Sequence, residues 1–279
     1  MKRKPASVPA KFRDKHLLYE GAVQEVDADL DFMQRVFRKH RGRPPRILRE
    51  DFCGTAKLSA AWVSRHRANQ AIGVDNHAPT LAWGERWHRS KLGPHANRMT
   101  LICDDVRSVS KPRADLLCAY NFSYSLFQTR EGLRDYFRHA SVGLKRDGIL
   151  VMDAFGGISS VQRNKETRSI PHATTPEGEP IPTYIYEWEH RHFDVINNHL
   201  IADIHFELAD GSRIERAFTY DWRLWSLPEL REILLEAGFR MVEIYIHGWE
   251  KNGEADGIYR LRKTFDNEDG WIAYVVGIR

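Results

Sequence analysis

Residues 47 to 56 read ILREDFCGTA, and this stretch decides how the chain folds. It opens with the apolar Ile47 and Leu48, continues with the acidic Glu50 and Asp51, and then turns on small residues. A buried strand that ends in a carboxylate and turns on small residues lets a ligand approach the backbone closely. The stretch therefore predicts the first strand of a ligand-binding sheet.

Short apolar segments and amphipathic segments alternate on either side of this turn. We expect helices at 27–40, 57–68, 79–92, 130–144 and from Ser226 to about 237, and strands at 46–50, 71–74, 99–103, 114–120, 149–153, 241–247 and 271–278. Helices between strands provide the crossovers that parallel strands need. The expected fold class is α/β, with a doubly wound, mostly parallel, Rossmann-like sheet of seven strands. The last strand is expected to be antiparallel, because residues 248–270 look like a loop.

The pattern changes between the fifth strand and the last helix. Residues 158–183 are rich in Ser, Thr, Pro and Gly and are expected to form a loop. Segments with period two follow at 184–194, 199–208 and 213–222 and predict an inserted three-stranded antiparallel meander. The expected organisation is a basic N-terminal tail and lead-in (1–26), a core (27–157 and 226–279) and an inserted substrate-side sheet (158–225).

The composition is that of an ordinary globular protein. Of the 279 residues, 42% are hydrophobic and 29% are charged, which excludes a disordered chain. No apolar run is long enough to span a bilayer, and the basic N-terminus lacks the apolar region of a secretory signal. The three cysteines, Cys53, Cys103 and Cys118, are widely spaced, so we expect reduced thiols and a cytoplasmic protein.

Carboxylates follow three consecutive strands. They are Glu50, then Asp75, then Asp104 with Asp105. Asp75 comes 21 residues after Gly54, because 75 − 54 = 21, and an acidic side chain about 20 residues after such a turn meets a ribose. The turn has no G-x-G-x-x-G or phosphate-binding loop, and Glu50 would repel a phosphate. A ribose and an adenine without phosphate, joined to a cationic group, fit S-adenosylmethionine.

The motifs resemble those of the class I S-adenosylmethionine-dependent methyltransferases. REDFCGTA is similar to their first motif, GVDN to the second, CDDV to the third, and LKRDGILVMD to a later one. The resemblance implies that Glu50 and the turn meet the methionine part, that Asp75 holds the ribose, and that Asp105 with Val106 meets the adenine. The implied cofactor-binding set is Glu50, Phe52, Cys53, Gly54, Thr55, Asp75, Asn76, Asp104, Asp105, Val106 and Asn121.

The first motif departs from the family at two glycine positions. Phe52 stands where the first glycine is expected, and Ala56 where the third is expected. We therefore expect the turn to differ locally, with Phe52 covering one side of the cofactor. Cys53 is not expected to act as a nucleophile, because nothing near it in the sequence would lower its pKa.

The acceptor is expected to be a small molecule that is methylated at nitrogen or oxygen by in-line displacement. Asn121 and Tyr124 follow the fourth strand, while Trp222 and Arg223 end the meander. We expect these four residues to border the acceptor pocket, with Arg223 suited to an acidic group on the acceptor. Tyr124 is the one candidate for a catalytic side chain.

Other functions stay open at this stage. The stretch NFSY, 121–124, resembles the Asn-Pro-Pro-aromatic motif of nucleic-acid amino-methyltransferases but lacks both prolines. A non-catalytic nucleotide-binding scaffold is a further alternative, while Glu50 and Phe52 argue against an NAD-dependent oxidoreductase. His190 and His192 form an H-x-H pair, which is too little to predict a metal site.

Overall fold

The computed structural model describes residues 7–250 and 255–279. The chain divides into two compact units, which are described separately. Among the described residues, the larger unit contains those from Val26 to Ile158 and from Trp225 to Arg279, and the smaller one contains those up to Glu25 and from Ser159 to Leu224. No helix in the described part of the chain is long and apolar enough to cross a membrane.

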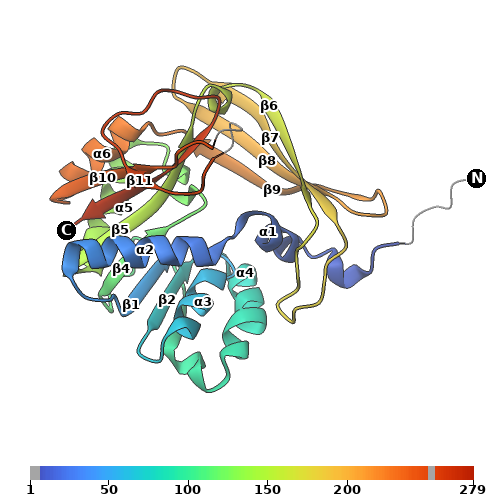
Figure 1. Ribbon diagram of the computed structural model, residues 1–279, viewed down its shortest axis with the longest axis horizontal. Helices are drawn as coiled ribbons and strands as arrows, with labels where there is room; N and C mark the ends of the chain where they lie inside the picture. The colour runs from blue at the N-terminus through green and yellow to red at the C-terminus, as the bar shows by residue number, and fades with distance from the viewer. Residues whose placement is uncertain (1–6, 251–254) are drawn as a thin grey trace, which may run out of the picture. The chain divides into compact units, whose positions relative to one another are not determined.

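The larger unit is built on a mostly parallel sheet with the strand order β11-β10-β12-β5-β4-β1-β2-β3 (Figure 1). The bounds are β1 (Ile47–Asp51), β2 (Gln70–Asp75), β3 (Met99–Cys103), β4 (Ala114–Ala119), β5 (Leu144–Gly156), β10 (Met241–Ile246), β11 (Arg260–Leu261) and β12 (Trp271–Ile278). Strand β1 pairs in parallel with both β2 and β4, so the strand order reverses beside it. Strand β12 runs antiparallel to β5 and β10. The expected fold class is confirmed, and the eighth strand is the two-residue β11.

Helices cover both faces of this sheet. On one face, α2 (Val26–Arg41), α3 (Lys57–Arg65) and α4 (Ala78–Gly84) pack in a cluster with Leu48, Cys118 and Val151. On the other face, α5 (Arg130–Gly143) and α6 (Leu227–Glu236) pack against the alternate residues of the same strands. The helix expected at 79–92 is wrong in its second half. After Gly84 the chain forms a π turn (Glu85–Arg89) and a 3-10 segment (Ser90–Arg98) that is kinked at Gly93.

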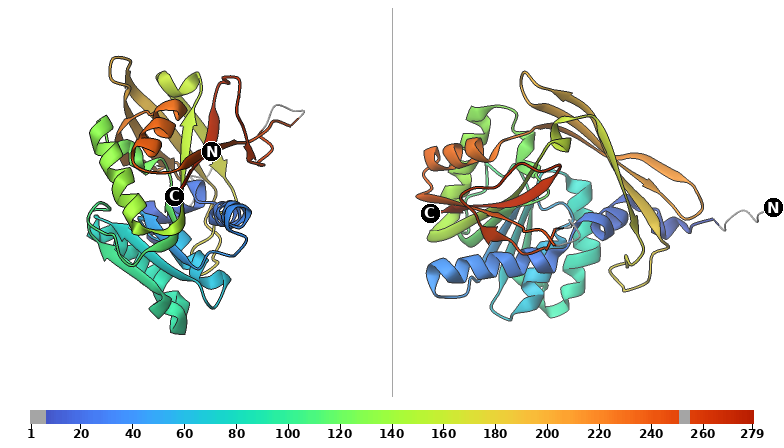
Figure 2. Two further views of the ribbon diagram at one scale, coloured as in Figure 1. Left: turned by 90° about the vertical axis from the view of Figure 1, so that its left-hand side faces the viewer. Right: turned by 45° about the horizontal axis from the view of Figure 1, so that its top comes forward.

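The smaller unit contains an antiparallel sheet of four strands rather than three (Figure 2). Its strands are β6 (Asn164–Ile170), β7 (Tyr184–Asp194), β8 (His199–Glu207) and β9 (Arg213–Arg223). The loop expected at 158–183 is thus wrong over β6, which pairs with β7 along its whole length. Its sequence, NKETRSI, lacks apolar alternation because β6 is an edge strand that is exposed over most of its length.

The N-terminal segment is a structured part of the smaller unit. Helix α1 (Lys15–Val23) packs closely against Tyr184. A Cβ added at Gly21 would lie 2.6 Å from the Tyr184 hydroxyl, so no side chain fits at this position. That hydroxyl donates a 2.6 Å hydrogen bond to the Leu18 carbonyl. Lys11 pairs with Glu179 and Arg13 with Asp210. The expectation of a simple basic tail is therefore wrong for residues 8–23, whereas Lys2, Arg3 and Lys4 lie outside the described residues.

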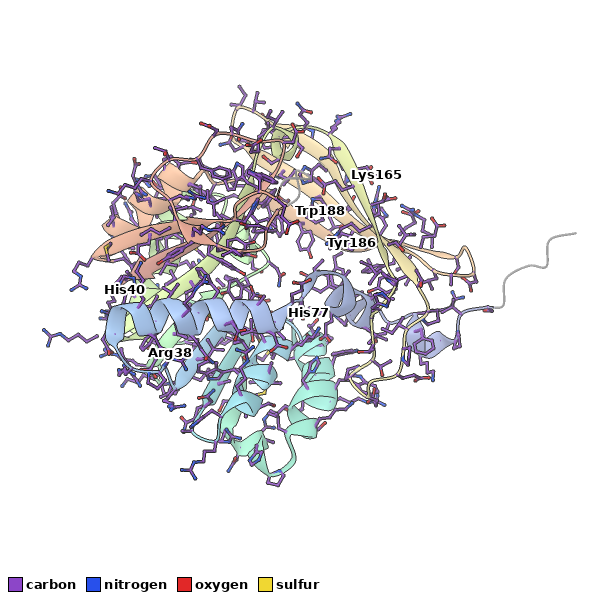
Figure 3. The ribbon with its side chains drawn as sticks, viewed as in Figure 1. Arg38, His40, His77, Lys165, Tyr186 and Trp188 are labelled. Atoms are coloured by element: carbon purple, nitrogen blue, oxygen red, sulfur yellow. The ribbon has the colours of Figure 1, made fainter. Side chains whose placement is uncertain are left out.

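The two faces of the smaller sheet differ in polarity. Leu200, Ala202, Ile204 and Phe206 lie on the buried face, with Tyr186, Trp188 and Tyr220 on the neighbouring strands. Figure 3 labels Tyr186 and Trp188 at alternate positions of β7. The pairing shifts between His190 and His192, so that His192 faces Ile201 and leaves this aromatic face. The H-x-H pair is therefore split between the two faces of the sheet.

Candidate functional site

The turn after β1 is tied to the end of β2. The Gly54 amide donates a 2.9 Å hydrogen bond to Oδ2 of Asp75, and the Cys53 amide donates one of 3.0 Å to the Val74 carbonyl. Oδ1 of Asp75 accepts from the His77 amide at 2.8 Å. Asp75 thereby fixes the first and second strand ends together, and the exposed Asn76 follows directly after it.

The turn keeps a left-handed backbone where the family would have glycine. The φ angles are +56° at Phe52, +53° at Gly54 and +56° at Ala56. Phe52 and Ala56 thus adopt a conformation that glycine favours, and the expected local difference from the family's turn stays a prediction. The Phe52 ring packs 5.4 Å from the Tyr136 ring and 6.1 Å from the Phe127 ring.

A close backbone approach holds the other side of the turn. A Cβ added at Gly84 would lie 2.2 Å from the Thr55 carbonyl oxygen, which leaves no space for any other residue. Helix α4 therefore packs directly against the turn. The requirement for glycine at 84 has no local signal in the sequence, because it arises from a tertiary contact.

Glu50 is buried beneath the turn and anchored to α3. Its Oε2 accepts hydrogen bonds from the Ser59 amide at 3.0 Å and the Ser59 hydroxyl at 2.6 Å. Burial raises the pKa of Glu50 to about 8, and the nearby Asp75 and Asp29 carboxylates raise it further, while the Ser59 hydrogen bonds oppose the shift. A cation beside Glu50 would favour its charged form.

Cys53 is a buried thiol in the same turn. It is 2% exposed, and burial raises its pKa well above the usual range, with further contributions from Glu50 and Asp75. A thiol with a raised pKa is a poor nucleophile. The structure agrees with the sequence in giving Cys53 a packing role.

The acids after β3 form a turn of their own. The Asp104 amide donates to the Asp75 carbonyl at 3.2 Å, which links the third strand end to the second. Asp105 pairs with the Arg107 guanidinium at 2.7 Å, and this hydrogen-bonded pair lowers the pKa of Asp105. The backbone from Asp104 to the buried Val106 therefore lies beside Asp75, as the expected nucleoside side of the site requires.

A buried arginine, which the sequence analysis missed, reaches this turn from β1. Arg49 is 1% exposed and pairs through Nε with Asp51 at 2.6 Å. Its Nη2 donates to the Val106 carbonyl at 2.7 Å, and its Nη1 donates to the Val109 carbonyl. The Tyr136 hydroxyl donates to Asp51 at 3.1 Å. The network joins the end of β1 to the loop after β3. Nothing in the sequence around Arg49 indicates that its side chain forms this network.

The turn after β4 is held by a second residue that the sequence analysis missed, Asp153. Asn121 and Phe122 both have left-handed φ angles, +55° and +57°. The Asn121 amide donates to Oδ2 of Asp153, and the Phe122 amide donates to Oδ1, each at 2.9 Å. Burial raises the pKa of Asp153 to about 7, and Asp29 raises it further. Asp153 lies in β5 and ends the strand expected at 149–153, so the signal that singled out Glu50 and Asp75 could have found it.

The four expected acceptor residues fall in different units. Asn121 and Tyr124 belong to the larger unit, and Tyr124 is a core residue, 2% exposed, with its ring 6.5 Å from that of Phe137. Trp222 and Arg223 belong to the smaller unit, where the buried Trp222 packs 4.2 Å from the Tyr220 ring. Their grouping around one acceptor stays a prediction.

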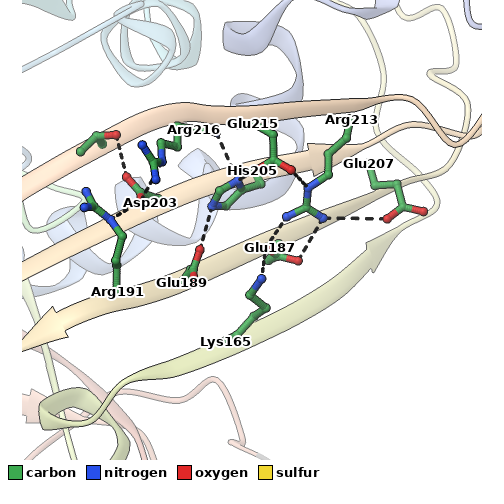
Figure 4. Close-up of polar contacts among 11 residues, drawn as sticks. Lys165, Glu187, Glu189, Arg191, Asp203, His205, Glu207, Arg213, Glu215 and Arg216 are labelled. Atoms are coloured by element: carbon green, nitrogen blue, oxygen red, sulfur yellow. Dashed lines mark hydrogen bonds and ion pairs between the residues drawn. The ribbon is translucent and has the colours of Figure 1, made fainter.

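The polar face of the smaller sheet carries a ladder of ion pairs (Figure 4). Both ring nitrogens of His205 face carboxylates, Nδ1 to Glu215 at 2.5 Å and Nε2 to Glu189 at 3.1 Å. Glu187 is engaged by Arg213 at 2.5 Å and by Lys165 at 2.9 Å. Glu187, Glu189 and His205 could in principle hold a metal ion, but cationic neighbours already pair with Glu187. The ion pairs satisfy the charged groups of this face, of which Glu187, Asp203 and His205 are themselves buried.

A hollow at the opposite edge of the larger sheet is basic. It has a volume of about 410 Å³ and lies where Pro45 and Asn69 precede β1 and β2. Arg38, labelled on α2 in Figure 3, Arg46 and Arg65 line it. Ligands of open α/β sheets bind at the carboxyl ends of the strands, so this hollow is separate from the candidate site.

The comparisons with known proteins reveal structural likeness. No protein-family model and no curated protein matches the sequence. A S-adenosylmethionine-dependent methyltransferase from Clostridium acetobutylicum ATCC 824 superposes with a TM-score of 0.67 at 16% identity, over 95% of this chain and 98% of that one. The sugar N-methyltransferase KedS8 from Streptoalloteichus sp ATCC 53650 gives 0.63 at 18% identity, over 99% and 94%. CalS10, an amino pentose methyltransferase from Micromonospora echinaspora, gives 0.64 at 13% identity, over 98% and 99%.

These matches cover nearly the whole length of the chain, the inserted sheet included. At identities below one fifth, the likeness concerns the path of the chain and not its chemistry. The chain therefore has the fold of these S-adenosylmethionine-dependent methyltransferases.

Proposed function

We propose that this protein transfers a methyl group from S-adenosylmethionine to a small-molecule acceptor. The observation that carries the proposal is the hydrogen bond from the Gly54 amide to Asp75, which fixes the carboxylate that we expect to bind the ribose beside the backbone turn after β1. Each Asp75 oxygen accepts one backbone hydrogen bond and keeps a lone pair for a ribose hydroxyl. The nucleoside would thus meet a carboxylate that is already positioned.

The other residues of the site have matching roles in this proposal. The backbone of Asp105 and Val106, held by Arg49, would border the adenine. Glu50 and the turn from Cys53 to Thr55 would face the methionine part, where a sulfonium and an ammonium favour a negative surrounding. The acidic character of this edge disfavours a cofactor with a pyrophosphate.

Nitrogen is the acceptor atom that we favour over oxygen. Two of the structures with this fold are described as a sugar N-methyltransferase and an amino pentose methyltransferase. A neutral amine attacks a sulfonium methyl group without a base, whereas a hydroxyl needs one. The protein would then chiefly align the amine with the methyl group and exclude water.

Nucleic acid is disfavoured as the acceptor. The alternative rests on Asn121 gripping an exocyclic amine and Tyr124 stacking on the base. In the structure the Tyr124 side chain lies in the core at 2% exposure and offers no ring face for stacking.

Transfer of a labelled methyl group tests the proposal. The protein is incubated with methyl-labelled S-adenosylmethionine and a panel of amino sugars and other aliphatic amines, beside the corresponding alcohols. We expect label in at least one amine product and none with Asp75→Ala at the same cofactor concentration. Label in alcohols alone would overturn the choice of nitrogen, and absence of cofactor binding would overturn the proposal itself.

A further inference from the structure

Three side chains next to the candidate site lie in a row across three strands. Tyr274 of β12 is paired with Asp153 of β5. In the next pair of strands, Ala119 is paired with Met152, so the following residue, Tyr120, lies alongside Asp153. Side chains alternate along a strand, and Tyr120 and Tyr274 both belong to the cluster that faces α2. Asp153 therefore lies between two tyrosines on the α2 face of the sheet.

A second carboxylate reaches this row from α2. The Tyr274 hydroxyl donates a 2.5 Å hydrogen bond to Oδ1 of Asp29, and the Tyr274 ring lies 5.9 Å from the Tyr120 ring. The Asp29 charge raises the pKa of Asp153 and of Tyr120, and that of Glu50 on β1. Three acids from three different elements, the buried Glu50 and the half-buried Asp29 and Asp153, therefore lie close enough to influence one another electrostatically.

The Tyr120 hydroxyl is the group that this environment leaves unsatisfied. Tyr120 is 7% exposed, and its hydroxyl has no hydrogen-bond partner among the residues that the structure describes. Leaving a buried hydroxyl unpaired costs about 1–3 kcal/mol, so such groups usually face a ligand or a bound water. Asp153 lies alongside Tyr120 on the neighbouring strand, and Asp29 accepts from the adjacent Tyr274 hydroxyl, so a hydrogen-bond donor with positive charge would complete the set.

We propose that the acidic cluster formed by Asp29, Tyr120, Asp153 and Tyr274 binds the ammonium group of an aliphatic amine acceptor. An ammonium has three donors and no acceptor, which matches two carboxylates and a phenol oxygen. The acidic cluster adjoins Asn121, whose amide Asp153 holds, and it lies on α2, β4, β5 and β12, away from the nucleoside side on β2 and β3. The inference rests on the proposed function, and it narrows the acceptor to an amine that binds as a cation. Because an ammonium nitrogen has no lone pair, it must pass one proton to a carboxylate of the acidic cluster before the neutral amine displaces the methyl group from sulfur.

The test uses a matched pair of probes, cyclohexylammonium and cyclohexanol, which share a shape and differ in charge. Each is titrated by ligand-observed NMR into the protein, alone and saturated with S-adenosylhomocysteine. We expect cyclohexylammonium to bind at least about tenfold more tightly than cyclohexanol, the ratio that one charge-assisted hydrogen bond supplies. Tyr120→Phe and Asp153→Asn should each weaken cyclohexylammonium binding by about tenfold.

The control is Tyr245→Phe, which removes a tyrosine hydroxyl from the hydrophobic cluster that faces α2. The Tyr245 hydroxyl accepts a hydrogen bond from Lys39 and donates one to Glu243. It should leave cyclohexylammonium binding unchanged. Tyr120→Phe should fold at least as stably as the wild type, because the hydroxyl that it removes has no partner in the described residues. The loss of amine affinity together with retained stability separates a binding role from a structural one.

Three results would overturn the inference. The first is equal binding of the two probes, and the second is unchanged amine affinity in Tyr120→Phe, as expected if the hydroxyl meets only water. The third is an equal loss of S-adenosylhomocysteine affinity in the variants, which would assign the acidic cluster to the cofactor. Normal S-adenosylhomocysteine binding without amine binding would refute this inference and leave the proposed function intact. Amine binding without S-adenosylhomocysteine binding would refute the proposed function and leave the binding of an amine at this cluster intact.

Discussion

The Gly54 amide and the Asp75 carboxylate are joined by a hydrogen bond of 2.9 Å across two neighbouring strand ends. The bond links the turn after β1 with the acid that follows Gly54 by 21 residues, the spacing expected of a ribose-binding carboxylate. The same carboxylate also caps the turn that begins at His77. Asp75 therefore shapes the proposed cofactor site as well as contributing to it.

Replacing Asp75 tests this double role. Asp75→Ala should lower the affinity for S-adenosylhomocysteine by roughly 2–4 kcal/mol, because two hydrogen bonds to the ribose are lost. Asp75→Asn should lose less, since its amide oxygen still accepts. Asp31→Asn, at an exposed acid on α2, is the control. Calorimetry that gives one dissociation constant for all three variants would contradict the assignment.

Ala56→Gly should stabilise the protein. Ala56 has a φ of +56°, a conformation that costs a residue other than glycine about 1–2 kcal/mol. Part of the gain is offset by the greater freedom of glycine in the unfolded chain, so we expect an increase of about 0.5–1 kcal/mol in the free energy of unfolding. The matched Ala60→Gly, inside α3, should lower it by about 1 kcal/mol. Urea titrations that show both changes in the same direction would refute the strained turn.

The Arg49–Asp51 pair should behave as a buried ion pair. Arg49→Met leaves the Asp51 carboxylate uncompensated and should cost about 3–5 kcal/mol of unfolding free energy. The double variant Arg49→Met with Asp51→Leu should cost clearly less than the sum of the single variants. Additive losses in urea unfolding would mean that the two side chains act independently.

Stability should fall as the pH rises toward 8. The pKa values of Glu50 and Asp153 are raised to about 8 and about 7, so the folded state holds more protons than the unfolded state between about pH 4 and these values. Their stabilising effect is fully present below about pH 4 and is lost as the pH passes through 7 to 8. Glu50→Gln keeps an oxygen that can accept from Ser59. It should reduce the loss of unfolding free energy at the upper end of this pH range by on the order of a few kcal/mol.

Thermal unfolding between pH 5 and pH 9, without ligand, measures this effect. Glu232→Gln, an exposed change on α6, is the control and should leave the pH dependence of the wild type intact. A stability that rises from pH 5 to pH 8 in the wild type would contradict the raised pKa values.

The core of the larger unit was predictable because its signals are local. Buried strands such as β4 are short apolar runs between amphipathic helices, and a capping box marks the start of α6 at Ser226. Elements that depend on a partner were not predictable. Strand β6 is polar and is defined by its pairing with β7, and α1 is short and is stabilised by its contact with Tyr184. Neither carries its own hydrophobic pattern.

The candidate site was predictable only in part, for the same reason. The acids Glu50 and Asp75 follow strands and are visible in the sequence. Arg49, Gly84 and Asp29 act through contacts with residues far along the chain, at Val106, Thr55 and Tyr274. Their roles require the fold, since their neighbours in the sequence are ordinary for a strand or a helix.

Cofactor binding is the measurement that tests the account most directly. The wild-type protein is titrated by calorimetry with S-adenosylmethionine, S-adenosylhomocysteine and NAD under one set of conditions. The account predicts micromolar binding of S-adenosylmethionine and S-adenosylhomocysteine and far weaker binding of NAD, because the acidic turn lacks the glycines that hold a pyrophosphate. NAD binding as tight as that of S-adenosylmethionine, or no binding of either sulfur compound, would contradict it.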